Sequence, residues 1–479
     1  MGGEGAKDLA ESGVSRARAA GATYAEARVQ RTWERQFVLK NGESQPSFFA
    51  EGYGIGIRVI SNGALGFAAT NDMKATSVAE LAKRAVRLAK ASSELLKKPV
   101  ELDDSKPVRR KWAPPETRRV ENADSEWLRS VLLDIEGRIA DGRAGVKLPG
   151  RLLYLGAELE ERYYVNSDGA RVEGRLPRIG FFGSLTAAEG GATAQRFIQQ
   201  GETGGLEVVK RIKLVEKVED EAKVMGKILK SAAKPPTDKV DVLLSPELSG
   251  IAAHESVGHP QEADRVLGRE GAQAGESYLK ADSLGRKIGS PEANVSDDPN
   301  LLHSNGFVPV DDEGVEGKKR FLIKGGIINE FLQNRSTARE LGVRSNGASR
   351  SVAFDREPII RMSNTFVEPG DYSTDEIVRE VKHGVFFKTF TEWNIDDKRL
   401  NQRYVALEAY LIERGEMKGL VRSPVLEITT PKLWGSVRAR SKHMEFESAT
   451  CGKGDPQQGA PVWTGGPETL LSAIKLGSR

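Results

Sequence analysis

Hydrophobic and polar residues along the first part of the chain follow patterns that predict both helices and strands. An alanine-rich helix is expected up to about Ala20, and another near Ser125–Ala140. Two apolar runs, Gly54–Ile60 and Ala64–Ala69, flank Ser61-Asn62-Gly63, and Asn-Gly between apolar runs is a strong hairpin signal. We therefore expect a mixed α/β sheet domain in this part of the chain.

Two further segments carry apolar residues at the three- and four-residue spacing of an amphipathic helix. The first follows Ser77-Val78-Ala79-Glu80, which has the pattern of a capping box. The second, Leu206–Lys230, is charged and carries an apolar stripe at Val208, Ile212, Val215, Val218, Ala222, Met225 and Leu229. Such a stripe suits either a seam with a partner helix or packing on the protein's own sheet, and we favour the second interpretation.

The best candidate for a domain boundary is Lys234–Asp238, because its proline pair must end the preceding helix. We therefore predict domains at 1–233 and 239–479. One helix is predicted after the capping box at Ser373. The second domain is otherwise predicted to be a curved, mostly antiparallel sheet, with strands at Arg320–Ile323, Ile327–Phe331, Gly384–Phe390, Arg403–Ile412 and Pro424–Ile428. The expected fold class is α+β.

The composition is that of an ordinary soluble protein with more than one core. The 479 residues include 38% apolar and 29% charged residues, and the net charge of +3 is too small for a general nucleic-acid footprint. No run of 18 apolar residues predicts a membrane span, and no apolar targeting segment is apparent near Met1. We expect a cytoplasmic protein that binds neither nucleic acid nor membranes.

The clearest chemical signal is His254-Glu255-Ser256-Val257-Gly258-His259, an HExxxH pattern. It is expected on a helix, because Ser245-Pro246-Glu247 supplies an N-cap serine, a proline at the first helical position and an acid in the first turn. In zinc peptidases with the shorter HExxH spacing, the two histidines bind the metal and the glutamate is the general base.

The spacing of five places the two imidazoles about 140° apart on a regular α-helix, too far to share one ion. The helix must therefore widen into a π-type turn or end. Gly258 and Pro260 flank His259, where a helix unwinds most readily. Either change lets His254 and His259 converge while Glu255 faces a metal-bound water.

A catalytic zinc ion usually has three protein ligands, so one more is needed. The candidates are Glu262, the histidines at 303, 383 and 443, and Cys451, the single cysteine. Cys451 lies in a predicted glycine-rich turn where Lys453 is available to favour a thiolate, and a soft thiolate suits zinc.

At these residues the chain closely resembles the TldD/PmbA family of peptidases, and specifically its metal-bearing TldD branch. The likeness extends along nearly the whole chain. It includes the segments Ala19–Ala22, Tyr24–Val29, Gly66–Asn71, His254–Asp264, Arg361–Thr365, Glu368–Asp371 and Cys451–Lys453.

This resemblance implies a Zn²⁺ site formed by His254, His259 and Cys451, with Glu255 as the catalytic glutamate. It also implies hydrolysis of unfolded or small modified peptides, and a dimer formed by the chain with itself or with a TldE/PmbA-like subunit. We also predict substrate contacts at Arg361 and Asn364. Two alternatives are a non-catalytic partner subunit that shapes a peptide chamber, and a cysteine peptidase that uses Cys451 with His443 or His254.

Overall fold

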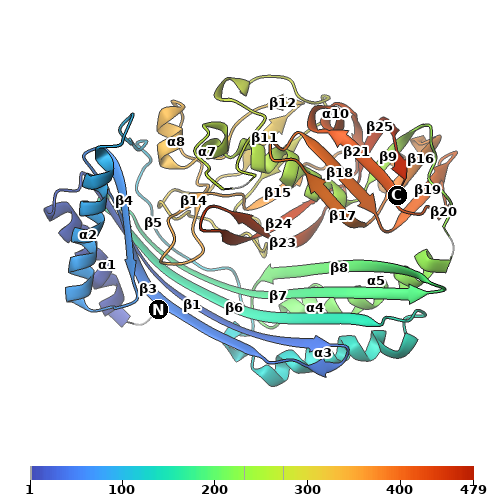
Figure 1. Cartoon of the computed structure of the whole chain (residues 1–479), viewed down its shortest axis with the longest axis horizontal. Helices are drawn as coiled ribbons and strands as arrows, with labels where there is room; N and C mark the ends of the chain where they lie inside the picture. Colours follow the sequence, from blue (N-terminus) through green and yellow to red (C-terminus); the bar gives the residue numbers. More distant parts are fainter. Residues whose placement is uncertain (1–2, 231, 273, 479) are drawn as a thin grey trace.

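The N-terminal half is built on one long, curved sheet (Figure 1). The computed structural model describes residues 3–230, 232–272 and 274–478. Within them this sheet has eight strands in the order β4-β3-β1-β6-β7-β5, with β2 beside β1 and β8 beside β7. The strands are β1 (Tyr24–Lys40), β2 (Glu43–Ser44), β3 (Phe48–Ser61), β4 (Ala64–Thr70), β5 (Arg109–Trp112), β6 (Gly150–Asn166), β7 (Arg171–Glu189) and β8 (Ala192–Thr203).

Helices cover one face of this sheet in two groups (Figure 1). The first group, α1 (Gly3–Ala19) and α2 (Ala75–Ser93), packs on the end of the sheet that holds β3 and β4. The second group packs on the other end and comprises α3 (Ser125–Ile139), α4 (Val208–Arg211) and α5 (Leu214–Lys230). The opposite face of the sheet is left for the C-terminal half (Figure 1).

The hairpin predicted at Asn62-Gly63 is confirmed, and both residues have the positive φ that a tight turn of this kind requires, 52° and 76°. The capping box predicted at Ser77 is wrong. Helix α2 begins earlier, after Lys74, and the Ser77 hydroxyl donates to Asp72 at 2.7 Å. A capping motif in sequence is thus open to competition from a nearby carboxylate.

The charged segment Leu206–Lys230 forms two helices instead of one, because Lys213 takes a left-handed φ of 50° between α4 and α5. Its apolar stripe packs against the protein's own sheet: Val208, Val218, Ala222 and Met225 belong to the core shared with β6 and β7. The interpretation as packing on the protein's own sheet is therefore confirmed.

The C-terminal half holds several smaller sheets around a second large core. Its described strands are β9 (Lys239–Leu244), β10 (Val295–Asp297), β11 (Arg320–Lys324), β12 (Ile327–Ile328), β13 (Ser349–Arg350), β14 (Ile359–Ile360), β15 (Asn364–Val367), β16 (His383–Phe387), β17 (Phe390–Ile395), β18 (Asn401–Ala406), β19 (Ala409–Glu413), β20 (Glu416–Leu420), β21 (Pro424–Thr429), β22 (Val437–Arg440), β23 (Glu445–Lys453), β24 (Gln458–Gly466), β25 (Thr469–Lys475) and β26 (Gly477–Ser478).

These strands pair in the orders β12-β11-β10-β15-β24-β23, β20-β19-β16-β9-β25-β22, β17-β18-β21-β26 and β13-β14. The α+β class is confirmed, but the expected single curved sheet is wrong for this half, because tight connections split the predicted strands.

The helices are α6 (Pro246–Ala253), α7 (Ala263–Val266), α8 (Arg335–Glu340), α9 (Thr374–Glu380) and α10 (Thr430–Gly435), and the capping box at Ser373 is confirmed. Along the described ranges, no helix has the length and apolar character needed to cross a membrane.

Buried ion pairs join the two halves on the inner face of the long sheet. Arg58 of β3 donates to Glu313 at 2.7 Å, and Arg162 of β6 donates to Asp312 at 2.9 Å. Breaking such a buried pair by removing one partner is costly, because the remaining charge has no compensation. These contacts fix how the C-terminal half lies over the sheet. We propose that the domain boundary itself lies between the two halves, at 234–238.

Candidate metal centre

The HExxxH segment lies on a helix that changes its winding where the sequence requires it. Ser245 caps α6 by accepting the backbone N–H of Leu248 at 3.3 Å. The helix then widens into a π-helical turn, η3 (His254–Gly258), followed by the 3-10 turn η4 (His259–Gln261). The predicted π-type turn is confirmed, and it returns residues five apart to one face of the helix.

Two glycines let this helix lie close to its neighbours. A Cβ atom on Gly250 would lie 2.3 Å from the backbone nitrogen of Gly465 in β24, and one on Gly258 would lie 1.9 Å from the sulfur of Met362. Side chains at either position would push the helix away from the sheet. The small residues therefore hold the histidines beside the strand pair β23 and β24.

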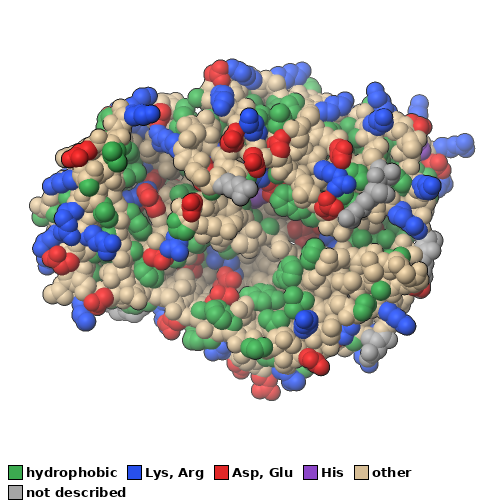
Figure 2. All heavy atoms as spheres, viewed as in Figure 1, with side chains coloured by type: hydrophobic (Ala, Val, Ile, Leu, Met, Phe, Trp, Pro, Cys, Tyr) green, Lys and Arg blue, Asp and Glu red, His purple; other side chains and the backbone are tan. Residues whose placement is uncertain are grey.

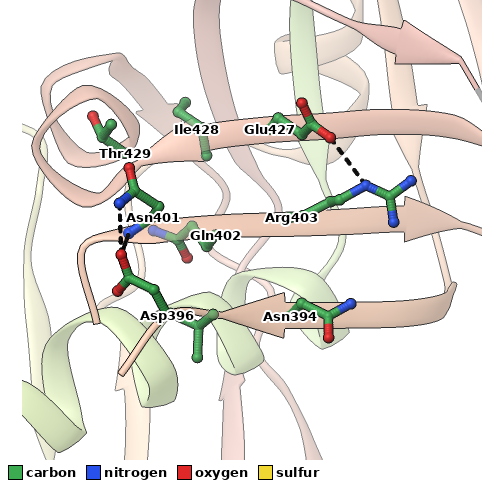
Figure 3. Close-up of a pocket in the computed structure, with 9 residues that line it drawn as sticks. Asn394, Asp396, Asn401, Gln402, Arg403, Glu427, Ile428 and Thr429 are labelled. Carbon is green, nitrogen blue, oxygen red and sulfur yellow. Dashed lines mark hydrogen bonds and ion pairs between the residues drawn. The ribbon is translucent and has the colours of Figure 1, made fainter. Parts of the chain in front are cut away.

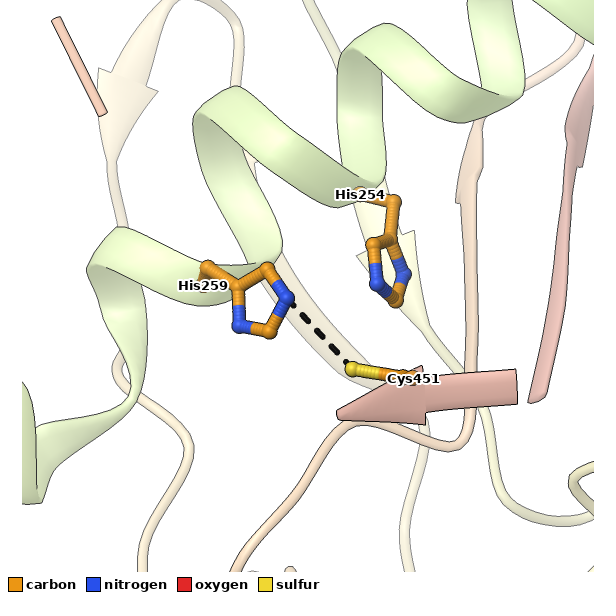
Figure 4. Close-up of side chains that lie close together, drawn as sticks. All are labelled: His254, His259 and Cys451. Carbon is orange, nitrogen blue, oxygen red and sulfur yellow. Dashed lines mark hydrogen bonds between the residues drawn. The ribbon is translucent and has the colours of Figure 1, made fainter. Parts of the chain in front are cut away.

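Three side chains converge at this point: His254, His259 and Cys451 (Figure 4). Their ligand atoms all lie within 4.8 Å of one another, and His259 Nε2 is 3.4 Å from Cys451 Sγ. The histidines come from the π-turn, and Cys451 comes from β23, which is an edge strand among the described strands. Pairing of Cys451 with Ala460 in β24 fixes the position of the thiol along that edge.

The protonation states of these groups suit a metal ion. Burial lowers the pKa of both imidazoles, which favours the neutral form that binds metals. Nδ1 of His254 is buried without a hydrogen-bond partner. Burial alone would raise the pKa of the Cys451 thiol, but His259 and Arg361 lower it to about 7. Two neutral imidazoles and a readily ionised thiol form a donor set that fits zinc.

Lys453 does not favour the thiolate as the sequence indicated, because it points elsewhere. Its ammonium group donates to Asp264 at 2.7 and 2.8 Å and lies 3.3 Å from Glu262. Glu262 in turn lies 3.1 Å from Nδ1 of His259. Burial alone would raise the pKa of Glu262, but Lys453, His259 and Arg265 hold it well below its usual value.

Glu262 is therefore a carboxylate behind His259 instead of a member of the three-donor cluster. A carboxylate that accepts the Nδ1 proton fixes the ring orientation and leaves Nε2 facing Cys451. Among the described residues, the group that could hold a metal ion is His254, His259 and Cys451.

Glu255 faces the same space as the cluster, and its carboxylate is held by an arginine. Arg399 Nη1 donates to Glu255 Oε2 at 2.5 Å, across 144 residues of sequence. Glu255 is only 4% exposed. A buried carboxylate next to a candidate metal ligand, with its orientation fixed, is well placed for proton transfer.

A cleft of about 670 Å³ opens in front of the cluster, and both halves of the chain line it. Figure 2 shows this face of the molecule hollowed between the two halves. Aromatic rings line part of the cleft: Phe182 and Phe197, from β7 and β8, stack at 6.1 Å, and Trp393 comes from β17. Phe197 and Trp393 are 44% and 37% exposed, so apolar surface is available to a ligand.

A buried ionic cluster connects the elements that line the cleft. Arg196 of β8 donates to Glu221 of α5 and to Glu247 at the start of α6. Burial raises the pKa of Glu247 to about 7, although Arg196 lies against it. These contacts link the N-terminal sheet to the helix that carries the histidines.

Neither Arg361 nor Asn364 lines the cleft, although Arg361 contacts the backbone of Cys451. Arg361 is 1% exposed and donates to the carbonyl oxygens of Gln458 and Cys451. Asn364 is fully buried, and its amide donates to the carbonyl of Asp298 at 2.6 Å. Arg361 thus stabilises the strand pair β23 and β24 at Cys451. We propose that any effect of these two residues on a substrate is indirect.

Several cleft residues gave no sequence signal. Arg399 lies in Asp396-Asp397-Lys398-Arg399, which has the composition of an ordinary polar turn. Phe182 and Phe197 resemble any aromatic residue in a strand. A period-two pattern along β7 and β8 indicates only which residues share a face of the sheet. It does not indicate which face lies toward His254, His259 and Cys451.

A buried His/His/Cys cluster beside a carboxylate, at the foot of a cleft, defines a candidate metallohydrolase centre. Comparison with known proteins gives the particular family. Models of PmbA/TldA metallopeptidases match as domain 1 at residues 25–89, as the central domain at 118–227 and as the C-terminal domain at 237–478. The chain belongs to this family, as the resemblance in sequence predicted.

Relatives and solved structures agree with this assignment. A metalloprotease of Methanocaldococcus jannaschii is 31% identical over 452 residues, which cover 92% of this chain and 94% of that protein. A protein named a zinc metalloprotease TldD homolog, from Saccharolobus solfataricus, is 30% identical over 51% of this chain and 52% of its own. The crystal structure of TldE from Thermococcus kodakarensis has the same fold, with a TM-score of 0.74 at 20% identity over 98% of this chain and 100% of that one.

Proposed function

We propose that this protein is a zinc-dependent peptidase, with the metal held by His254, His259 and Cys451 and with Glu255 as the general base. The observation that carries the proposal is the convergence of these three donors within 4.8 Å beside a buried glutamate. Relatives named as metalloproteases support the same conclusion. Three protein donors are the number that a catalytic zinc ion usually has, and these residues would hold the ion with a further position for water or substrate.

When bound there, zinc would act as a Lewis acid that lowers the pKa of a water molecule and polarises the scissile carbonyl. Glu255 accepts a proton from the attacking water and then delivers it to the leaving amine. Glu262 keeps His259 in the tautomer that leaves Nε2 free. The low exposure of all these groups limits competing contact with bulk water.

The substrates we propose are unfolded or small modified peptides bound in an extended form. Thr450, Cys451 and Gly452 of β23 line the cleft, and β23 is an edge among the described strands. An edge strand offers backbone N–H and C=O groups to an added peptide strand. Recognition of this kind depends more on main-chain shape than on sequence.

The alternative of a cysteine peptidase rests on one observation, the contact of 3.4 Å between Cys451 Sγ and His259 Nε2. It leaves the buried Glu255 without a role. The suggested partner His443 is exposed and pairs with Glu445 at 2.9 Å, so it is occupied elsewhere. A non-catalytic subunit would have no use for the full donor set. Metal dependence separates all three possibilities.

The test is a zinc titration of the chelated protein, followed by release of amines from an unstructured peptide. We expect the metal-free protein to be inactive, and activity to rise to a plateau at about one zinc per chain, because one three-donor site is available. Full activity without metal would support the cysteine peptidase. No hydrolysis at any zinc concentration would support the non-catalytic subunit.

We also propose that the protein acts as a dimer, with a second copy of itself or a TldE/PmbA-like subunit, in the cytoplasm. Phe48 and Phe49 on β3 are 45% and 54% exposed, and exposed aromatic surface is typical of an interface. Light scattering should therefore report about twice the chain mass of 52.2 kDa, or a complex with a partner of similar size. A stable, active monomer would contradict this prediction.

A further inference from the structure

Arg399 occupies an unusual place for a charged residue in a hairpin turn. It lies between β17 and β18, and its side chain reaches into the cleft lined by His254, Glu255 and Cys451. The side chain is only 11% exposed, and Nη1 donates to Glu255 at 2.5 Å. A guanidinium with little solvent exposure therefore lies beside the proposed base and the proposed metal donors.

The turn that carries Arg399 is fixed from two sides, and Figure 3 shows one of them, the contact of Asp396 with Asn401. The carboxylate of Asp396 accepts the backbone N–H groups of Leu400 at 2.7 Å and Asn401 at 3.2 Å, and the Asn401 amide at 2.5 Å. The carbonyl of Arg399 accepts the Thr430 hydroxyl at 2.8 Å. These hydrogen bonds fix the conformation of the turn, and the turn positions the Arg399 side chain in the cleft.

The backbone of Arg399 is strained. Its φ of 64° lies in the left-handed region, where glycine or asparagine is much less costly than a long side chain. Such residues persist where the surrounding structure enforces them, and they concentrate at functional sites. The strain and the buried ion pair together indicate that this side chain is held in the cleft for a reason other than stability.

Of the two arginines among the described residues that line the cleft, Arg399 is the one with donor capacity left. The other lining arginine, Arg196, is held on both sides by Glu221 and Glu247. Among the described residues, Arg399 forms an ion pair with Glu255, and its Nε is buried without a hydrogen-bond partner. A guanidinium offers five N–H donors in a fork, so one carboxylate does not exhaust it.

We propose that Arg399 is a catalytic residue that binds the carbonyl oxygen of the scissile peptide bond as negative charge develops on it. This inference rests on the proposed peptidase function. A thiolate among the metal donors reduces the positive charge at the site compared with three neutral histidines. A second cation would therefore add to the stabilisation of the negative charge on the carbonyl oxygen.

The step balances in charge and atoms. The water oxygen bonds to the carbonyl carbon, the C=O electron pair moves to the oxygen beside Arg399, and the water proton goes to Glu255. The C–N bond then breaks as the carbonyl re-forms, and Glu255 returns the proton to the leaving amine. The glutamate loses negative charge as the oxygen gains it, so Arg399 keeps an anionic partner throughout.

The test compares Arg399→Met, Arg399→Lys and the matched control Lys398→Met in the zinc-loaded full chain. Lys398 lies in the same turn, but its side chain is 64% exposed. We expect Arg399→Met to retain its zinc and to lose about 10²–10³-fold in kcat with little change in KM, because the contact forms in the transition state. Arg399→Lys should fall between it and wild type, and Lys398→Met should match wild type.

A second readout needs no turnover. A phosphinic peptide, which mimics the tetrahedral state, should bind Arg399→Met weaker by the same factor as the loss in kcat, when measured by calorimetry. A loss confined to KM, or unchanged phosphinic affinity, would overturn the proposal. If Arg399→Met fails to keep zinc, the phosphinic affinity of Arg399→Lys decides the matter. An inactive wild type would refute the peptidase function itself, which is a separate outcome.

Discussion

Cys451→Ala is expected to lose most of its zinc and nearly all peptidase activity, although the substitution changes one small buried side chain. Mutation of a group that only supports a ligand typically weakens metal binding about 10–100-fold, so removal of a direct ligand should weaken zinc binding by more than about 100-fold. Zinc affinity is best measured by competition with a chromophoric chelator.

Two comparisons make this experiment decisive. Glu262→Gln should weaken zinc binding about 10–100-fold without abolishing it, because Glu262 contacts His259 Nδ1 and not the open side of the cluster. A nucleophilic cysteine predicts a different pattern, in which Cys451→Ala is inactive but keeps its full zinc content. Tightly bound zinc in Cys451→Ala would refute the ligand role and make Glu262 the third donor.

Glu255→Gln is expected to keep its zinc and to lose about 10²–10⁴-fold in kcat, the usual contribution of a general base. The amide has nearly the same shape as the carboxylate but does not accept the proton from water. The side chain adjoins His254 without being one of the three clustered donors. Metal analysis beside steady-state kinetics measures both quantities on one sample.

Glu276→Gln is a suitable control, because Glu276 is in the same half of the chain and its side chain is 66% exposed. It should match wild type in zinc content and turnover. Near-normal hydrolysis by Glu255→Gln would contradict the proposed mechanism. Loss of zinc from Glu255→Gln would also contradict it, since the glutamate would then support the metal and not the proton transfer.

Local signals predicted much of the fold. Asn62-Gly63 specified its turn because few residue pairs accept positive φ at both positions. Helix α3 and the cap at Ser373 followed from short-range patterns in the same way. The prediction at Ser77 failed because the competing carboxylate of Asp72 is not part of the capping pattern. Some of the C-terminal strands were predicted and others, among them β23, were not: Cys451 was expected in a glycine-rich turn but lies in that strand. The division of these strands into separate sheets depends on long-range pairing.

The site shows the same division between local and distant information. The spacing of His254 and His259 showed that the helix must widen or end there, because helix geometry is local, and the structure has the π-turn. The position of Cys451 came from a resemblance, since 192 residues separate it from His259. Arg399 was missed because its proposed role depends on a contact with Glu255, 144 residues away, and no pattern in the turn sequence indicates that contact.

The most direct test of the central claim is anomalous diffraction at the zinc edge from crystals of the purified protein. The account predicts a strong peak about 2.0–2.1 Å from a nitrogen of His254 and of His259, and about 2.3 Å from Cys451 Sγ. A peak at other residues, or zinc-free crystals of a fully active protein, would contradict it.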